Sequence, residues 1–284
     1  SDVLLAAGDA SGALAKCDEA LSIQTTRGGL ASLIGYRYAC ALLANHKILA
    51  AKDQAKYALS KERNFQKRRR DLGDTEKWHL PAALLLSILC EVKLAQGKPD
   101  HALTLVDKVV AEFREAGSER HLPIGLALRA RVHRHMFVHT GDATHVSIAE
   151  RDLKEMTEIT EDGRMLVHQA DRAIISAALS ASRARAELWR LDGRENSPVR
   201  RPWTLGLFSK KKPADKQPIE PAEAAALAHD FVRSALESLA TAEGLVETIG
   251  YARRRPEVSE LRRQIRELED RIKALRRDLD STKR

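Results

Sequence analysis

Small and apolar residues recur along this chain at helical spacing. Five segments carry them at positions i, i+4 and i+7, which lie on one stripe of a helix. The stripes are Ala13/Cys17/Ala20, Ala51/Ala55/Ala58, Ala102/Val106/Val109, Ala149/Leu153/Met156 and Ala235/Leu239/Ala242. Because each stripe is narrow, we predict five helices that pack closely against their neighbours.

Turn signals and longer apolar segments flank these stripes. Gly8-Asp9, Gly97-Lys98-Pro99 and Gly141-Asp142 precede three of them, and glycine can end a helix in the left-handed conformation. The segments that predict further helices are Leu30–Ala44, Leu80–Gln96, Pro123–His139 and Met165–Leu191. The repeating unit is therefore helix, short turn, helix. Since a single pair cannot bury its faces alone, we predict that the pairs stack into an α-solenoid.

Composition agrees with an all-α fold. Alanine, leucine and long charged residues dominate, and these residues lose little rotamer freedom in a helix. Aromatic residues make up only 4% of the 284 residues, and the β-branched runs typical of strands are nearly absent. We predict a repeat domain of about five helix pairs over residues 1–255, followed by a separate helix over residues 256–284.

Two parts of the chain resemble tetratricopeptide (TPR) repeats, and a third resembles a related family. The segment Leu89-Cys90…Gly97-Lys98…Ala102…Val106…Val109 is similar to the TPR pattern L-G…G-D…A…F…A, and Gly141-Asp142 through Ala149–Leu153 to Ile159 resembles a second TPR helix. The segment Gly250–Val258 resembles the close of the longer repeats at the C-terminus of bacterial STAND-type signalling ATPases and MalT-like regulators. The resemblance covers roughly residues 1–258.

The repeats also depart from the TPR pattern. The stripes are 38, 51, 47 and 86 residues apart, whereas TPR units repeat every ~34 residues. Leu or Ala replaces most of the signature Trp and Tyr residues. These departures leave the number of repeats open.

The resemblance implies a non-catalytic scaffold or ligand sensor that binds a protein or peptide partner in a concave groove. The first helix of each pair would line that groove, which makes Glu91, Arg131 and His135 the candidate groove residues. Ser1–Ala7 has the pattern of a helix whose beginning is missing. We therefore expect a fragment of a larger signalling protein with any ATPase or effector domain upstream.

Two basic segments interrupt the repeats. Residues 61–77 are predicted to form an insertion that carries a basic patch, Arg68, Arg69 and Arg70. Residues 195–221 are predicted to form a second insertion, because their prolines disfavour a continuous helix. This second segment is interpreted either as a docking loop or as a flexible insertion. Its docking candidates are Arg200, Arg201, Trp203, Phe208, Lys210, Lys211 and Lys212.

The C-terminal segment carries a heptad pattern. Its apolar positions alternate at spacings of three and four residues: Val258, Leu261, Ile265, Leu268, Ile272, Leu275 and Leu279. Isoleucine or valine at a and leucine at d are typical of a parallel two-stranded coiled coil, which would make a homodimer. A helix that caps the last repeat would need the same stripe. The sequence leaves both alternatives open.

Candidate chemistry is sparse. The phosphate-loop, dinucleotide-binding and nucleophile-elbow motifs are absent, so neither an enzyme nor a cofactor is indicated. His133, His135, His139 and His145 cluster, and His135 and His139 have a spacing that could share a metal. The glutamate of the HExxH motif and an obvious third ligand are missing. We therefore interpret these histidines as surface or groove residues and expect no metal.

Cysteine usage and hydropathy point to the cytoplasm. The three cysteines lack CxxC spacing, which favours neither a disulfide framework nor a zinc site. The sequence shows no apolar run of the ~18 residues that a membrane span needs, so no membrane is expected as a partner.

The net charge of +8 keeps a second class of function open. Arg68–Arg70 and Lys210–Lys212 could contact phosphates in a basic, dimeric nucleic-acid-binding regulator, although no base-reading motif is present. A regulatory subunit or domain of a larger enzyme is a further alternative.

Overall fold

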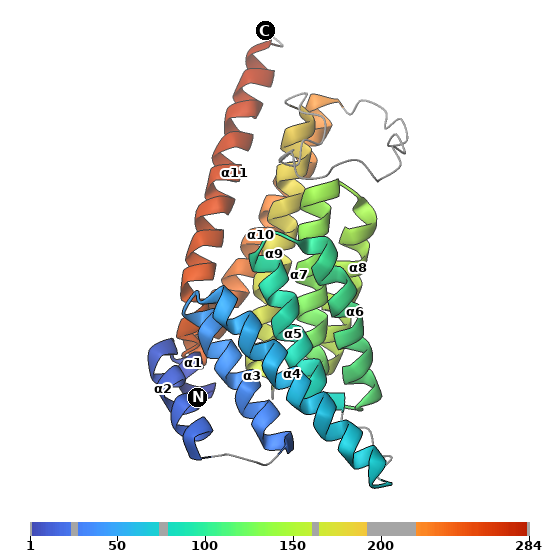
Figure 1. Cartoon of the computed structure of the whole chain (residues 1–284). Coiled ribbons are helices and arrows are strands. Elements are labelled where there is room, and N and C mark those ends of the chain that lie inside the picture. The colour runs from blue at the N-terminus through green and yellow to red at the C-terminus, as the bar shows by residue number, and fades with distance from the viewer. Residues whose placement is uncertain (1, 24–27, 74–78, 161–164, 192–219, 283–284) are drawn as a thin grey trace.

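The computed structural model describes residues 2–23, 28–73, 79–160, 165–191 and 220–282, and within these ranges every regular element is a helix (Figure 1). The α-helices are α1 (Asp2–Ala6), α2 (Ala10–Ile23), α3 (Gly28–Ala44), α4 (Ile48–Asp71), α5 (His79–Ala95), α6 (Pro99–Glu115), α7 (Leu122–Thr140), α8 (Ala143–Thr160), α9 (Leu166–Leu191), α10 (Pro221–Thr248) and α11 (Arg255–Thr282). A short 3₁₀ helix, η1 (Ala252–Arg254), precedes α11. The predicted all-α class is confirmed.

The five predicted stripes lie on the even-numbered helices. All of their residues are buried except Ala20, which is half-buried. The four other predicted helices correspond to α3, α5, α7 and α9 and agree with them to within a few residues at each end. The periodic pattern therefore predicted both which segments form helices and which face of each even-numbered helix is packed.

The predicted turns are also present. Gly97 and Gly141 have φ angles of +68° and +71°, in the left-handed region that glycine adopts without a steric penalty. Between α3 and α4 a histidine does the same, since His46 has a φ of +58°. The amide of Lys47 then donates to the carbonyl of Leu42 at 2.9 Å and closes the end of α3. These tight turns make successive helices antiparallel neighbours.

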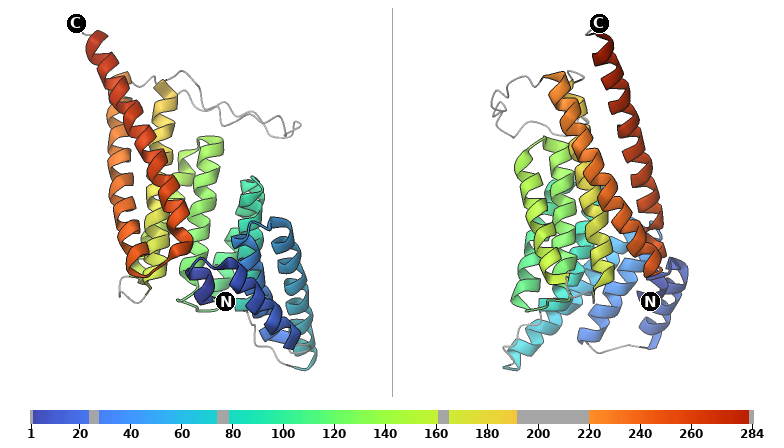
Figure 2. Two further views of the ribbon diagram at one scale, coloured as in Figure 1. Left: turned by 90° about the vertical axis from the view of Figure 1, so that its left-hand side faces the viewer. Right: turned by 180° about the vertical axis from the view of Figure 1, so that it is seen from behind.

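The helices form two layers. From α1 to α11 each helix packs against the next one in the chain, and α3, α5, α7, α9 and α11 also pack against the next odd-numbered helix. Within the described residues the backbones of the even-numbered helices do not pack on one another, although Arg114 of α6 reaches the carboxylate of Glu155 on α8 at 2.7 Å. Figures 1 and 2 show the result, in which successive pairs lie side by side along the molecule. One side of the odd-numbered helices is left only partly covered, and its residues are half-buried.

The stripe on α11 packs within its own chain. Val258, Leu261, Ile265, Leu268 and Ile272 are buried in one apolar cluster with α9 and α10, and Leu275 packs at its edge. Leu279, near the end of the helix, is half-buried. This arrangement corresponds to the capping alternative, and a homodimer through the same stripe would require these side chains to leave the core.

The first and last helices also meet. Ala6 of α1 packs against the cluster of α9, α10 and α11, and a Cβ placed on Gly8 would lie 3.6 Å from that of Ala252. Figure 2 accordingly shows the N-terminal end beside the base of α11. The helix array thus curves far enough to bring η1 against its first turn.

The two predicted insertions have different outcomes. Residues 61–71 extend α4 as a continuous helix, because Lys, Glu, Arg and Gln are good helix formers and the three arginines in its last turn interact favourably with the helix dipole. Most of the second insertion, residues 192–219, lies outside the described residues, and Pro221 begins α10. Proline suits the first turn of a helix, where its missing N–H is not needed.

Candidate functional site

The partly covered side of the odd-numbered helices carries the three predicted groove residues. The guanidinium of Arg131 on α7 lies 3.7 Å from the carboxylate of Glu91 on α5. Their side chains are 28% and 32% exposed, so both are accessible without being fully solvated. His135 follows Arg131 by one turn of α7 and is half-buried on the same side. The structure therefore brings all three residues together.

Arg134 lies among them and was not predicted. Its guanidinium donates to Ser182 Oγ on α9 at 3.4 Å and to His135 Nε2 at 3.1 Å. Burial, followed by the charge of Arg131, lowers the pKa of Arg134 to about 10, while Glu257 opposes the shift and Arg185 adds to it. Among the described residues Arg134 has no carboxylate within 4 Å. It is a cation in a partly dry site that has no direct ion-pair partner, although the charge of Glu257 acts on it.

His135 is neutral in this environment. Because an arginine can only donate, Nε2 of His135 must accept the bond from Arg134 and carries no proton. Burial and then the charges of Arg134 and Arg131 lower the pKa of His135 to about 4. The ring therefore adds no positive charge at neutral pH.

The short helix η1 and the first turn of α11 complete this face. Arg254 donates to Asp171 of α9 at 2.8 Å and to Glu257 at 2.6 Å. Burial opposes ionisation of Glu257, but the charges of Arg254, Arg131 and Arg134 outweigh it and hold its pKa below the ordinary value. We call this region the odd-helix surface: Glu91, Arg131, Arg134, His135, Arg185 and Glu257.

A shallow pocket adjoins the odd-helix surface between the end of α7 and the second half of α9. It is lined by Phe137, Val138, Gly141, Ser182, Arg185, Ala186, Trp189 and Arg190. Ser182, which receives a hydrogen bond from Arg134, links the pocket to the charged residues. The pocket thus combines apolar walls with one hydroxyl and the side chains of Arg185 and Arg190.

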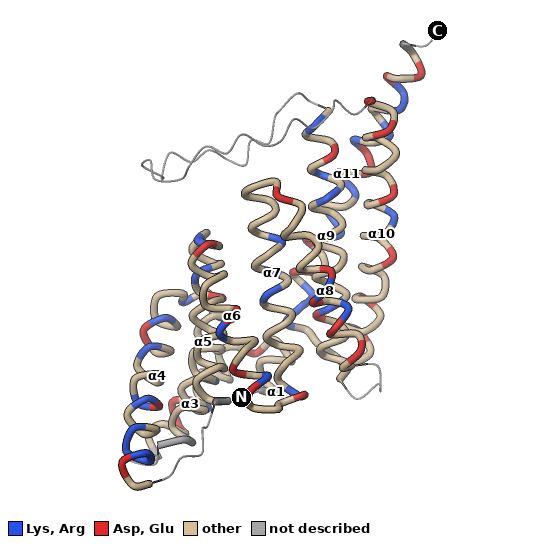
Figure 3. Tube along the Cα trace, turned by 90° about the vertical axis from the view of Figure 1, so that its right-hand side faces the viewer, with Lys and Arg blue, Asp and Glu red and all other residues tan. Residues whose placement is uncertain are grey.

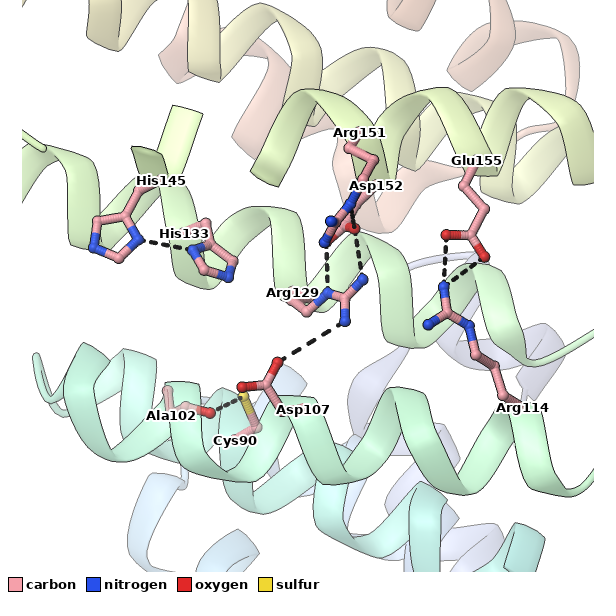
Figure 4. A network of polar contacts seen from close by, with 10 residues as sticks. All are labelled: Cys90, Ala102, Asp107, Arg114, Arg129, His133, His145, Arg151, Asp152 and Glu155. Carbon is pink, nitrogen blue, oxygen red and sulfur yellow. Dashed lines mark hydrogen bonds and ion pairs between the residues drawn. The ribbon is translucent and has the colours of Figure 1, made fainter. Parts of the chain in front are cut away.

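A buried ion pair lies on the other side of α7 (Figure 4). Arg129 donates from Nε and an Nη atom to the two carboxylate oxygens of Asp152 on α8, both at 2.7 Å. Asp107 of α6 and Arg151 lie 3.9 Å from this pair. The hydrogen bond to Asp152 raises the pKa of Arg129 despite its burial. This bidentate pair fixes α7 against α8 and so positions the odd-helix surface.

Two of the other clustered histidines, His133 and His145, belong to this buried side. Nδ1 of His133 lies 2.9 Å from Nδ1 of His145, so one ring donates, the other accepts, and the two cannot both be charged (Figure 4). Burial and then His145 lower the pKa of His133. His139 is exposed. In the described part of the chain no three His, Cys, Asp or Glu side chains are grouped as metal ligands.

Cys90 is a packed thiol. Its Sγ lies 3.4 Å from the carbonyl oxygen of Ala102, and burial raises its pKa (Figure 4). Since the thiolate is the reactive species, a buried thiol of this kind is inert. Its role is close packing between α5 and α6.

The predicted basic patch lies apart from the odd-helix surface. Arg68, Arg69 and Arg70 occupy the last turn of α4, where Figure 3 marks basic positions toward the end of the helix. The guanidinium of Arg69 lies 5.9 Å from the ring centre of Phe65. The docking candidates Arg200, Arg201, Trp203, Phe208, Lys210, Lys211 and Lys212 lie outside the described residues.

A larger cavity, of about 430 Å³, lies between α8, α9 and α10. Its charged groups are paired: Arg183 contacts Glu150 at 2.5 Å and lies over the ring of Phe231 at 4.1 Å, and Asp230 contacts Arg233 at 2.7 Å. Ser180 and Ser234 are within hydrogen-bond distance at 3.3 Å. The odd-helix surface differs from this cavity because part of its charge is unpaired.

Comparisons with known proteins do not identify this chain. No protein-family model matches the sequence, and no curated protein matches it. The TPR resemblance therefore depends on the pattern of the chain. None of the described helices is both long enough and apolar enough to cross a membrane.

Proposed function

We propose that this chain is a TPR-like α-solenoid that acts as a non-catalytic scaffold or sensing module. A protein or peptide segment would bind the odd-helix surface, which would form the concave side of the array. The layering of α3, α5, α7, α9 and α11 supports this arrangement, because helical-repeat proteins bury the contacts between repeats and leave one helix face for partners.

The observation that carries the proposal is the set of charged side chains on that face. Three odd-numbered helices and the first turn of α11 contribute half-exposed groups that lie within electrostatic range of one another. A fold gains little stability from such groups, since partly exposed ion pairs contribute only about 0–1 kcal/mol. Arginine and tryptophan are also the residues that most often dominate binding energy at interfaces. A binding role explains the arrangement better than a purely structural role.

Affinity capture from a lysate of the source organism tests this proposal. The tagged chain, its Arg131→Glu variant and a control, Arg63→Glu on α4, would be compared at low and high salt by mass spectrometry. Arg63 is exposed and lies off the odd-helix surface, so its replacement makes the same change of charge elsewhere. We expect one protein to survive high salt with the wild type and the control and to be lost with Arg131→Glu.

Two outcomes would contradict the proposal. Capture that is equally strong with folded Arg131→Glu protein would show that the partner binds another surface. Nucleic acid that is retained at low salt and lost at high salt would instead indicate the basic regulator, because phosphate contacts are strongly salt-dependent.

A further inference from the structure

We propose that the odd-helix surface binds an acidic side chain of the partner segment at Arg134 and Arg185, beside the shallow pocket between α7 and α9. This inference rests on the proposed function and names the chemistry of the partner at one place on the odd-helix surface.

The balance of charges around the pocket supports an anionic ligand. Three of the nearby arginines have carboxylate partners: Arg131 with Glu91 at 3.7 Å, Arg190 with Glu187 at 2.8 Å and Arg254 with Asp171 at 2.8 Å. Within the described residues neither Arg134 nor Arg185 has a carboxylate within ion-pair distance. A further carboxylate, Glu257, contacts Arg254 at 2.6 Å and lies within electrostatic range of Arg134. The five arginines therefore outnumber the four carboxylates by one, and one positive charge is in excess.

Arg134 is already ordered and partly dehydrated, so binding a carboxylate costs it less than it would cost an arginine in bulk water. Arg134 is held in place by its bonds to Ser182 and His135, so little side-chain entropy would be lost on binding. Burial has already removed part of its hydration, as the lowered pKa of its guanidinium indicates. A carboxylate that accepts hydrogen bonds from a guanidinium in such a site forms one of the stronger contacts in proteins.

The apolar walls of the pocket indicate which kind of residue lies next to the acidic residue in the bound peptide. Phe137, Val138, Ala186 and Trp189 line it beside Arg185. An apolar residue next to the acidic one would bury surface there. Single-stranded nucleic acid instead needs a continuous basic track along its backbone, whereas the neighbouring arginines here are already paired. The geometry thus favours a peptide in which acidic and apolar residues adjoin.

Binding of defined peptides by the whole chain tests the proposal. The probe is a short fluorescein-labelled peptide of alternating Glu and Leu, acetylated and amidated so that only its side chains are charged. The matched probe replaces Glu by Gln, and a labelled oligothymidylate serves as the nucleic-acid arm. Fluorescence anisotropy at low salt would give Kd for each probe.

We expect the Glu/Leu peptide to bind at least about tenfold more tightly than the Gln/Leu peptide, because a hydrogen bond to a charged group contributes more than a neutral one. Arg134→Gln and Arg185→Gln should each weaken Glu/Leu binding by about tenfold. Arg63→Gln and Arg276→Gln make the same change of charge at exposed positions of α4 and α11 and should leave Kd unchanged. Thermal melts would verify that each variant is folded.

The proposal would be overturned if the wild type did not distinguish the two peptides, or if the control variants weakened binding as much as the pocket variants. Preferential binding of the oligothymidylate, lost in the pocket variants, would assign the site to phosphate instead. Failure of this proposal can be distinguished from failure of the proposed function. A natural partner that is lost with Arg131→Glu but retained with Arg134→Gln and Arg185→Gln would leave the scaffold standing and reject only this pocket.

Discussion

Arg129 and Arg134 lie five positions apart on α7 and have opposite environments. Arg129 points between α6 and α8, where both oxygens of Asp152 accept its hydrogen bonds at 2.7 Å (Figure 4). Arg134 points toward α9, where it finds a hydroxyl and a neutral imidazole. The fold raises the pKa of the first guanidinium and lowers that of the second.

The difference separates a structural arginine from a binding candidate. A buried cation with a bidentate carboxylate is satisfied within the chain, and removing either partner leaves an uncompensated charge. A partly buried cation that has no direct ion-pair partner makes the fold less stable, and a ligand can supply that partner. The stability of variants at the two positions should therefore change in opposite directions.

Removing the carboxylate of Asp152 should have the largest effect. Asp152 is fully buried, so Asp152→Ala leaves Arg129 buried without a counter-ion. We expect the free energy of unfolding to fall by about 3–5 kcal/mol, measured by urea denaturation. Asp107→Ala is the matched control, because Asp107 is 61% exposed and lies 3.9 Å from Arg129, and it should cost less than about 1 kcal/mol. Equal losses in the two variants would show that Asp152 is not specially required.

Lowering the pH should have the next largest effect on the stability of the fold, through His135 on the odd-helix surface. The pKa of His135 is lowered from 6.5 to about 4 in the folded state. Between these values the unfolded chain binds a proton that the folded chain does not, so stability falls as pH decreases through this window. This pKa shift corresponds to a loss of up to about 3 kcal/mol in the free energy of unfolding once the pH is below the pKa of the folded state. The lowered pKa values of His121, His133 and His168 act in the same direction.

The His135→Gln variant isolates the contribution of this ring. Glutamine can still accept a hydrogen bond from Arg134 but does not titrate. Urea denaturation at pH 7 and pH 4.5 should therefore show a smaller loss of stability in the variant than in the wild type. The same loss in both proteins would assign the acid sensitivity to other groups.

The sequence predicted the helices better than the surface they form. The stripes and turn glycines are local signals, and they placed α3, α5, α7 and α9 to within a few residues. Residues 61–71 carry few apolar positions and many charges, which is why they were interpreted as part of an insertion although they continue α4. The heptad on α11 looks the same whether its partner is α10 or a second chain, so sequence alone left the two alternatives open.

The candidate site was predicted only in part. Glu91, Arg131 and His135 were placed by repeat position, and they do lie together. Arg134 and Arg185 were missed, although the density of arginine and histidine in α7 was a signal. Whether an arginine meets a carboxylate or a neutral group depends on residues far along the chain, such as Asp152 for Arg129 and Ser182 for Arg134. Local spacing does not contain that information.

Removing the charge of Arg134 should stabilise the fold. Arg134→Gln keeps much of the aliphatic stem and an N–H donor for Ser182, while it removes a partly buried cation with no carboxylate partner within the described residues. We expect a gain of about 1 kcal/mol, since lost stem packing offsets part of the relief. Urea denaturation of this variant and of Arg63→Gln, which should not change, measures the difference. A clear loss of stability would place Arg134 with Arg129 as a structural residue.

The smallest effect is expected for the pair Glu91 and Arg131. Their charged groups are 3.7 Å apart and about one-third exposed, so solvent screens their attraction and each side chain keeps some freedom. A double-mutant cycle with Glu91→Gln and Arg131→Gln should give a coupling energy below about 1 kcal/mol that decreases with added salt. The pair then contributes little to folding, yet both groups stay ionised and correctly placed on the odd-helix surface. A coupling as large as that expected for Arg129 and Asp152 would mean that this face is held together like the buried side of α7, and the contrast between the two sides would be lost.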